Sequence, residues 1–154
     1  MAIVYLGIGT NLGDRERNIK ATLELFKKKI RINHVSSFFK TKPEEGADGS
    51  YFLNGVAEIE TDLKPDELLI FLKDIEEKLG REKNHKKGDA RVIDLDIIFY
   101  DSLILNKKNL VIPHSKFRKR KFVLEPLNEI APNFRDPITK KSVEKLLREI
   151  NENH

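Results

Sequence analysis

The sequence contains no cysteine and no tryptophan, and only one methionine. Without cysteine the chain can form no disulfide bridge and carry out no thiolate chemistry, which fits the reducing cytoplasm, where we expect the protein to act. No apolar run approaches the roughly 20 residues of a membrane span, and the first residues lead into a predicted strand rather than a signal peptide. The histidines, at positions 34, 85, 114 and 154, are too scattered for a zinc site.

What the sequence does contain is charge. Of its 154 residues, 35% are charged and 39% are hydrophobic, and the net charge is +4. We expect one soluble domain over residues 1–154, long enough to bury a single core. The positive excess lies in two segments, 81–91 with five cations against two anions and 116–121 with five cations and no anion. This excess is too small to predict a nucleic-acid partner.

Hydrophobic periodicity and turn residues predict a mixture of strands and helices without a regular βαβ rhythm. The predicted strands are 2–8, 32–39, 52–61, 91–100 and 110–112, with 103–105 as a hairpin partner of 91–100. Four helices are predicted. The first follows Asp14 as N-cap, the second runs from Lys64 to Leu79, the third begins near Phe122, and the fourth spans 142–150. This order favours an α+β fold, a ferredoxin-like sandwich with a mostly antiparallel sheet and helices packed on it.

The segment Arg91–Tyr100 carries the most unusual pattern. Alternation along a strand places Ile93, Leu95, Ile97 and Phe99 on one apolar face and Asp94 with Asp96 on the other. Two carboxylates about 6.5–7 Å apart repel each other by roughly 2–3 kcal/mol at an effective dielectric constant near 20. Either this face is simply solvated, or the pair binds hard cations such as Mg²⁺, which often arrives with substrate phosphates.

Cations flank the predicted strand ends, and they are Arg81, Arg91, His114 and Arg120. Each by itself is more typical of a solvated surface, but together with the carboxylate pair they could hold a nucleoside triphosphate. On the strand 52–61, Phe52 and Asn54 share one face, so an aromatic ring and an amide point the same way. Polar segments at 42–50 and 81–90 are expected to be mobile loops that cover the reactants.

Several motifs, in order, resemble one enzyme family. The segment Arg91-Val92-Ile93-Asp94-Leu95-Asp96-Ile97 is similar to the signature Pro-Arg-Thr-(Ile/Leu)-Asp-(Ile/Leu)-Asp of the 6-hydroxymethyl-7,8-dihydropterin pyrophosphokinases of folate biosynthesis. Further similarity lies in Tyr5–Asp14, Pro113-His114 and Phe122–Pro132, so the resemblance covers nearly the whole chain. Two positions depart from the family pattern: Gly88-Asp89-Ala90 stands in place of Trp-Gly-Pro, and Ser115 in place of a frequent Tyr.

The resemblance implies an ATP-dependent diphosphokinase that transfers the pyrophosphoryl group of ATP to the pterin's hydroxymethyl group. It implies that Asp94 and Asp96 hold two Mg²⁺ ions. We expect the protein to be a monomer without nucleic-acid or membrane partners. The implied ATP-binding residues are Glu76, Arg81, Arg91, Ile97 and His114. The implied pterin-binding residues are Thr41, Phe52, Asn54 and Phe122. The implied catalytic residues are Arg81, Arg91 and Arg120.

Two other functions stay open at this point. Ferredoxin-like sheets also form nucleotide- or RNA-binding modules without turnover. The sequence has no Gly-Phe-Gly-Phe-like segment, and acids on the strand 91–100 would repel a phosphate backbone. A regulatory nucleotide sensor that keeps the site without turnover is the second alternative.

Overall fold

The computed structural model describes residues 1–42, 51–80 and 92–153, and the fold below is that of these residues. Arg81 and Arg91, together with most of the two loops expected to cover the reactants, lie outside the described residues.

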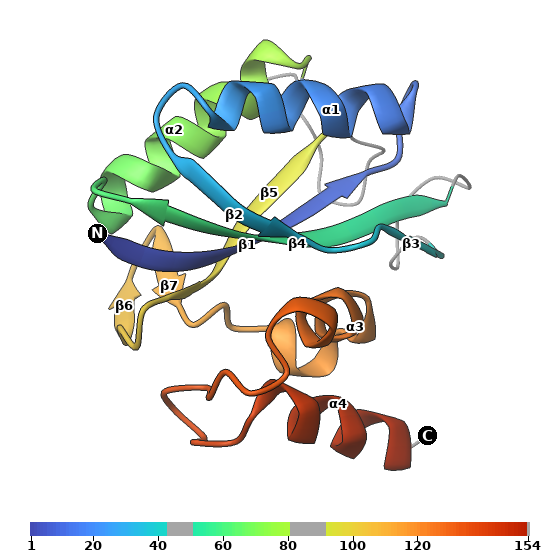
Figure 1. Cartoon of the computed structure of the whole chain (residues 1–154), viewed down its shortest axis with the longest axis vertical. Helices are drawn as coiled ribbons and strands as arrows, with labels where there is room; N and C mark the ends of the chain where they lie inside the picture. The colour runs from blue at the N-terminus through green and yellow to red at the C-terminus, as the bar shows by residue number, and fades with distance from the viewer. Residues whose placement is uncertain (43–50, 81–91, 154) are drawn as a thin grey trace.

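The described chain forms three layers, with the sheet in the middle (Figure 1). Helices α1 and α2 cover one face of the sheet, and α3 and α4 lie below the other face. The strands are β1 (Ala2–Thr10), β2 (Arg31–Val35), β3 (Phe39–Thr41), β4 (Phe52–Thr61), β5 (Asp94–Tyr100), β6 (Leu105–Lys107) and β7 (Leu110–Ile112). The helices are α1 (Arg15–Phe26), α2 (Pro65–Lys78), the short 3₁₀ helix η1 (Phe117–Lys119), α3 (Lys121–Ile130) and α4 (Val143–Glu152).

The main sheet is antiparallel and has the order β2-β4-β1-β5, with β3 also paired to β4. This arrangement confirms the predicted α+β class with a mostly antiparallel sheet. Strand β5, which carries the two aspartates, lies at the end of this order beside β1. One edge of β5 is therefore available to face a pocket rather than another strand of this sheet.

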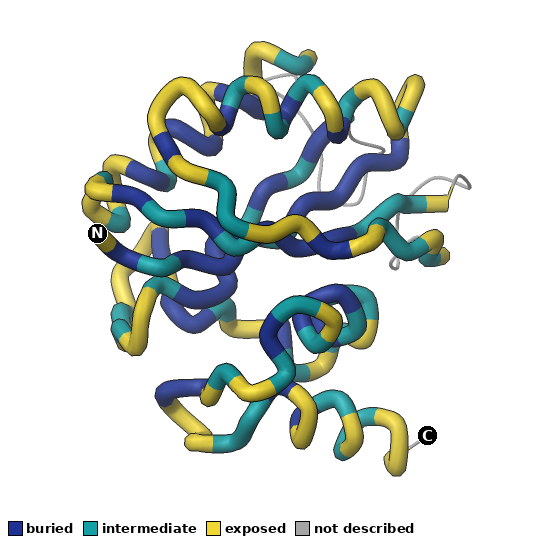
Figure 2. The backbone as a smooth tube through the Cα atoms, viewed as in Figure 1, coloured by how far each residue is buried: buried dark blue, intermediate teal, exposed yellow. Residues whose placement is uncertain are grey.

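Apolar residues fill the space on both sides of the sheet, so the described chain has two cores (Figure 2). The first core joins Leu6, Ile8 and Ile59 of the sheet to α1 and α2, and the second joins Tyr5, Val56 and Phe99 to α3 and α4. Strand β4 has the predicted bounds and faces, with Ala57 and Ile59 in the first core and Val56 in the second. Burial on both faces fixes the strand register, because a slip of one residue would exchange the two faces.

The predicted face assignment along β5 is wrong for Phe99. Ile97 lies in the first core, but Ile98 and Phe99 both belong to the second, and Tyr100 packs against the first. The pairing with β1 shifts register between Tyr5 and Leu6, where Leu6 pairs with Ile97 and Tyr5 with Phe99. A β-bulge of this kind inserts one extra residue and reverses the alternation beyond it. The two aspartates precede the bulge, so their shared face is kept.

Two further strand predictions are wrong. The strand predicted at 32–39 is interrupted after Val35, where the Ser36 hydroxyl accepts a hydrogen bond from Val56 N–H at 2.9 Å, and a separate β3 begins at Phe39. Serine hydroxyls compete with sheet hydrogen bonding in this way. The segment 103–105 does not pair with β5, because β6 begins at Leu105 and pairs with β7.

The helix ends follow local sequence. The Asp14 carboxylate accepts a hydrogen bond from Arg17 N–H at 3.1 Å, so Asp14 caps α1 as predicted. Gly80, with a φ of 108°, ends α2. The Ser142 hydroxyl accepts from Lys145 N–H and caps α4. The helix predicted near Phe122 is α3, which continues through Pro126.

Candidate active site

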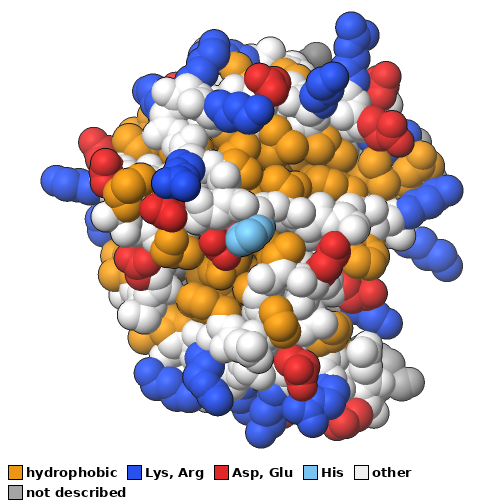
Figure 3. All heavy atoms as spheres, viewed as in Figure 1, with side chains coloured by type: hydrophobic (Ala, Val, Ile, Leu, Met, Phe, Trp, Pro, Cys, Tyr) orange, Lys and Arg blue, Asp and Glu red, His pale blue; other side chains and the backbone are white. Residues whose placement is uncertain are grey.

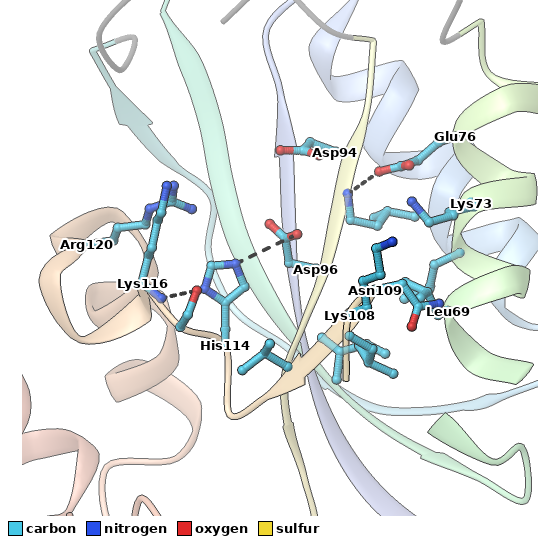
Figure 4. Close-up of a pocket in the computed structure, with 16 residues that line it drawn as sticks. Leu69, Lys73, Glu76, Asp94, Asp96, Lys108, Asn109, His114, Lys116 and Arg120 are labelled. Carbon is cyan, nitrogen blue, oxygen red and sulfur yellow. Dashed lines mark hydrogen bonds and ion pairs between the residues drawn. The ribbon is translucent and has the colours of Figure 1, made fainter. Parts of the chain in front are cut away.

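Asp94 and Asp96 lie on β5 beside an open pocket of about 490 Å³. Figure 4 shows them in the middle of the site, between α2 on one side and the segment after β7 on the other. In β1 they pair with Gly9 and Gly7, so β1 places no side chain beside the carboxylates. The side chain of Asp96 is 44% exposed, which leaves its oxygens accessible to a ligand in the pocket.

Glu76 fixes the free edge of β5 from the side of α2. Its residue is only 4% exposed, and its Oε2 accepts a hydrogen bond from Leu95 N–H at 2.8 Å (Figure 4). A buried backbone N–H at a strand edge needs such a partner, because an unsatisfied donor is costly. Glu76 thus lies at the pocket as expected, and it holds the backbone between the two aspartates. Ile97, also expected to bind ATP, lines the pocket while its side chain belongs to the first core.

His114 reaches the pocket from the segment after β7. Its backbone N–H donates to Ile98 O at 3.0 Å, and its Nε2 lies 4.0 Å from Asp96 Oδ1 (Figure 4). Burial, together with the positive charges of Arg120 and Lys116, lowers the pKa of His114 to about 4 and outweighs the opposite effect of Asp94. His114 was predicted to be a cation, and this prediction is wrong at neutral pH, because burial disfavours the imidazolium.

The tautomer of the neutral His114 ring follows from its second nitrogen. Lys116 N–H donates a hydrogen bond to Nδ1 at 3.1 Å, so Nδ1 is the acceptor and Nε2 carries the proton. The Nε2–H group points toward Asp96 in Figure 4. His114 therefore offers a neutral N–H donor at the pocket, which can bind a phosphoryl oxygen without adding positive charge.

Cations reach the pocket from two sides. Arg120 and Lys116 approach from the segment that precedes α3, and Lys73 and Lys108 approach from α2 and the β6–β7 turn (Figure 4). Not every cation of the basic segment 116–121 takes part. Arg118 instead donates two hydrogen bonds to the Asp136 carboxylate, whose residue is fully buried. Arg118 is thus a structural residue that anchors the segment from which Arg120 projects.

Three of the residues expected to bind a flat heterocycle lie together on β3 and β4. Asn54 Nδ2 donates to Thr41 Oγ1 at 2.7 Å, and Thr41 pairs with Phe52 across β3 and β4. Phe122 lies on α3, and its ring is 5.4 Å from the Arg120 guanidinium carbon. Among the described residues, the ring pairs in contact do not include Phe52 with Phe122. The two rings are therefore not in contact with each other. Binding of a flat ligand between them requires that they be apart.

Two sets of contacts stabilise this half of the site, and neither was predicted from the sequence. The Glu129 carboxylate of α3 accepts hydrogen bonds from Ser37 N–H and from the Ser37 hydroxyl at 2.8–3.1 Å, which ties α3 to the chain entering β3. Arg15 and Lys40 approach the Tyr51 ring at 3.9 and 4.1 Å from its centre. Both contacts join residues that are far apart in sequence, so no local spacing could have signalled them.

Three further residues of the site were not predicted from the sequence, and they are Lys73, Lys108 and Gly9. Lys73 is three residues before Glu76, so helical spacing from that acid could have found it. Lys108 lies in the β6–β7 turn, and its place at the pocket depends on the β6–β7 pairing that was predicted wrongly. In the described part of the chain no group of three or more His, Asp or Glu could hold a metal by protein ligands alone.

The face of the molecule in view in Figure 3 gives no support to the RNA-binding alternative. Its Lys and Arg side chains lie around the edges of this face and are mixed with Asp and Glu, rather than gathered into one patch. The sheet face that carries Asn54 and the aspartates is partly covered by α3 and α4. No helix in the ranges that the structure describes is long and apolar enough to cross a membrane.

A ferredoxin-like α+β fold, with a carboxylate pair beside a pocket lined by cations, is consistent with the class of enzymes that handle a nucleoside polyphosphate. The comparisons place the chain more narrowly. Residues 5–132 match the model of the 7,8-dihydro-6-hydroxymethylpterin-pyrophosphokinase (HPPK) family, and the chain belongs to that family.

Named relatives agree with this assignment. The chain is 38% identical over 141 residues to the 2-amino-4-hydroxy-6-hydroxymethyldihydropteridine pyrophosphokinase of Aquifex aeolicus, covering 92% of this chain and 88% of the relative. It is 42% identical over 135 residues to the folic acid synthesis protein FOL1 of Dictyostelium discoideum, covering 88% of this chain. The chain spans only 20% of the length of that longer relative.

Solved structures support the fold. The wild-type HPPK-DHPS crystal structure from Plasmodium falciparum superposes with a TM-score of 0.77 at 18% identity, covering 96% of this chain and 44% of that chain. At this level of identity the likeness bears on the fold alone, and it supports the ferredoxin-like interpretation.

Proposed function

We propose that this chain transfers the pyrophosphoryl group of ATP to the hydroxymethyl group of 6-hydroxymethyl-7,8-dihydropterin, giving AMP and the pterin diphosphate, in folate biosynthesis. One observation carries the proposal. The aspartate pair and the group of Thr41, Phe52 and Asn54 lie on strands that are joined through β1, in a chain whose family match covers residues 5–132. This arrangement supports the proposal of a triphosphate half-site and a heterocycle half-site on neighbouring strands of one sheet.

The triphosphate half-site is the pocket beside β5. Arg120 would bind the transferred group, and the neutral Nε2–H of His114 would donate to a phosphoryl oxygen. Glu76 holds the edge of β5 so that the aspartates keep their positions. Family membership supports Arg81 and Arg91 as further phosphate ligands and catalytic residues, although both lie outside the described residues.

The donor set at Asp94 and Asp96 fits Mg²⁺. The ion prefers oxygen ligands and is commonly held by one or two carboxylates, with waters and substrate phosphates completing its coordination. Two adjacent carboxylates without a third protein ligand among the described residues match that pattern. We propose that the pair holds two Mg²⁺ ions, which would neutralise charge on the triphosphate when bound.

The heterocycle half-site would hold the pterin between the rings of Phe52 and Phe122. A flat heteroaromatic ring favours aromatic faces together with a paired donor and acceptor at its edge. Asn54 supplies such an amide, and its hydrogen bond with Thr41 fixes the direction of the amide. The contact of Glu129 with Ser37 sets the position of α3, and hence of Phe122, relative to β3.

The proposed reaction is a displacement at the β-phosphorus. The hydroxymethyl oxygen forms a bond to the β-phosphorus and gives up its proton to water, the bond from that phosphorus to the oxygen bridging to the α-phosphorus breaks, and AMP leaves with that oxygen. The part of this chain is to position both reactants and offset charge, because phosphoryl transfer needs little covalent chemistry from the protein. Arg120 lies between the two half-sites, within reach of Phe122, and would stabilise charge on the transferred group.

The products test the proposal. The purified chain is incubated with ATP, Mg²⁺ and 6-hydroxymethyl-7,8-dihydropterin, and the reaction is followed by phosphorus NMR. We expect AMP and a pterin diphosphate. ADP with a monophosphorylated pterin would contradict transfer from the β-phosphorus, and an absence of turnover would favour a nucleotide sensor.

We propose that residues 1–154 act as one pyrophosphokinase domain, as a monomer, in the cytoplasm. The absence of cysteine and the charged composition support a cytoplasmic setting. Light scattering on the purified chain would test the monomer.

A further inference from the structure

Gly9 of β1 lies between the two half-sites. In the sheet it pairs with Asn54 of β4 on one side and with Asp94 of β5 on the other. Neighbouring strands are about 4.8 Å apart, so the backbones of Asn54 and Asp94 are separated by about 10 Å, with Gly9 midway. The proposed acceptor-binding amide and the proposed metal carboxylate therefore have a position without a side chain between them.

The space above Gly9 is filled by the amide of Asn54. A Cβ atom added at Gly9 would lie 2.8 Å from Asn54 Oδ1, which is closer than real Cβ contacts, so the amide would have to move. The amide is held from its other side, because its Nδ2 donates to Thr41 Oγ1 at 2.7 Å. The Asn54 side chain thus lies between Gly9 and Thr41, and Thr41 leaves it little freedom to shift while the hydrogen bond is kept.

Backbone conformation does not explain this glycine. The glycines with positive φ in the described ranges are Gly13 and Gly80, and Gly9 is paired on both sides in an ordinary antiparallel register. Any residue can adopt that conformation. The requirement at Gly9 is therefore for space next to Asn54.

Gly7 supplies a matched comparison two residues earlier on the same face of β1. It pairs with Val56 and Asp96, in the same two neighbouring strands. A Cβ atom added there would meet the Ile98 side chain at 3.5 Å and the Asp96 Cβ at 3.9 Å, which are ordinary van der Waals contacts. The same substitution at Gly7 and Gly9 therefore differs chiefly in whether the Asn54 amide is displaced.

We propose that Gly9 is a positioning residue for the acceptor, which acts by leaving the space that holds the Asn54 amide in the orientation that reads the edge of the heterocycle. This inference rests on the proposed function for the identity of the acceptor. It assigns selectivity for the pterin to a residue that contributes no side chain. Substitution at Gly9 then weakens recognition of the acceptor and leaves binding of the nucleotide unchanged.

The experiment compares Gly9→Ala with Gly7→Ala. Steady-state kinetics give KM for each substrate, and calorimetry gives the affinity for a non-hydrolysable ATP analogue with Mg²⁺. We expect Gly9→Ala to raise KM for the pterin about tenfold or more, the effect of a lost buried hydrogen bond, and to leave nucleotide affinity unchanged. Gly7→Ala should stay within about twofold of the wild type in both values, which is the usual scale of a surface-like substitution without strain.

Asn54→Ala separates an effect through the amide from a general disturbance of the strand. If Gly9 acts through Asn54, Gly9→Ala combined with Asn54→Ala should be no more impaired, and no less heat-stable, than Asn54→Ala alone. Fully additive losses would overturn the inference. Equal losses in Gly7→Ala and Gly9→Ala would overturn it as well.

A readout without substrate keeps this inference separate from the proposed function. In the free protein, the side-chain NH₂ signal of Asn54 in a ¹H–¹⁵N spectrum should shift in Gly9→Ala and stay in place in Gly7→Ala. An unchanged Asn54 signal in Gly9→Ala would refute the role of Gly9. A wild type that neither binds nor converts the pterin would instead overturn the proposed function, and the Asn54 signal would still decide the question of Gly9.

Discussion

Replacing Asp96 by Asn should change stability and activity in opposite directions. In the free protein the substitution removes one of two like charges on β5, so the folded state should become more stable. In the enzyme it removes a proposed ligand of Mg²⁺, so turnover should be lost. Substitution of a residue with a purely structural role would lower stability and turnover together.

The magnitude follows from the geometry of the strand. Residues two apart on one face are about 6.5–7 Å apart, which corresponds to a repulsion of roughly 2–3 kcal/mol at an effective dielectric constant near 20. The side chain of Asp96 is 44% exposed, so solvent screens part of this repulsion. We expect about 1 kcal/mol of stabilisation, which raises Tm by about 2–4 °C in a chain of this size.

Thermal unfolding with and without Mg²⁺ and an ATP analogue is the assay. Without ligands, Asp96→Asn should unfold at the higher temperature. With saturating Mg²⁺ and analogue, the wild type should gain stability by mass action and overtake the variant. Asp74→Asn supplies the control, because Asp74 is an exposed acid on α2 that does not line the pocket, and it should alter neither Tm nor turnover.

Two results would refute this reasoning. Near-normal turnover by Asp96→Asn at ordinary Mg²⁺ concentration would exclude the carboxylate as a required metal ligand. A lower Tm without ligands would show that the two acids do not repel each other in the free protein, and that a hydrogen bond of Asp96 outweighs the repulsion.

Three other predictions concern the rest of the site. Phe122→Leu keeps apolar bulk but removes the ring, so calorimetry should show pterin binding weakened by about 0.5–1.5 kcal/mol, and an unchanged affinity would exclude stacking. Burial by itself raises the pKa of Asp136, but its hydrogen bonds, chiefly from Arg118, outweigh burial and hold the pKa below its usual range. The ionised carboxylate therefore stabilises the fold above about pH 4, and this stabilisation is lost as the pH falls through the lowered pKa. Asp136→Asn should therefore cost about 3 kcal/mol in urea unfolding at pH 7 and lessen the loss of stability in acid, and a wild-type acid profile in the variant would contradict this. Finally, ¹⁵N NMR at pH 7 should find His114 neutral with the proton on Nε2, and signals of a doubly protonated ring would be inconsistent with its environment.

The sequence predicted those parts of the structure that depend on local pattern. The bounds and faces of β4, the cap at Asp14 and the end of α2 at Gly80 all follow from periodicity, capping and turn chemistry over a few residues. The aspartate pair was found for the same reason, because alternation along a strand places Asp94 and Asp96 on one face. The family itself was identified from motifs along the chain, and the family match confirms it.

The errors have a common physical origin in pairing between distant segments. The bulge that moves Phe99 to the second core arises in the register between β5 and β1, and no local pattern within β5 marks it. The wrong partner for 103–105 is also an error of pairing. The charge of His114 depends on burial and on Arg120, which is close in space through the fold, so a charge count along the sequence could not give it.

The ion pair of Arg118 with Asp136 also bears on where the folded unit ends. The family match stops at residue 132, but the partner of Arg118 comes from beyond that point, and Val143 and Leu146 of α4 complete the second core. A chain shortened to residue 132 would keep every residue proposed to touch a substrate. It would nevertheless leave the Arg118 guanidinium, whose side chain is only 25% exposed, without the Asp136 carboxylate. It would also expose one side of α3 to solvent. The match to the family model therefore ends inside the second core, and any fusion or transplantation of the domain must keep the residues after 132 that complete this core.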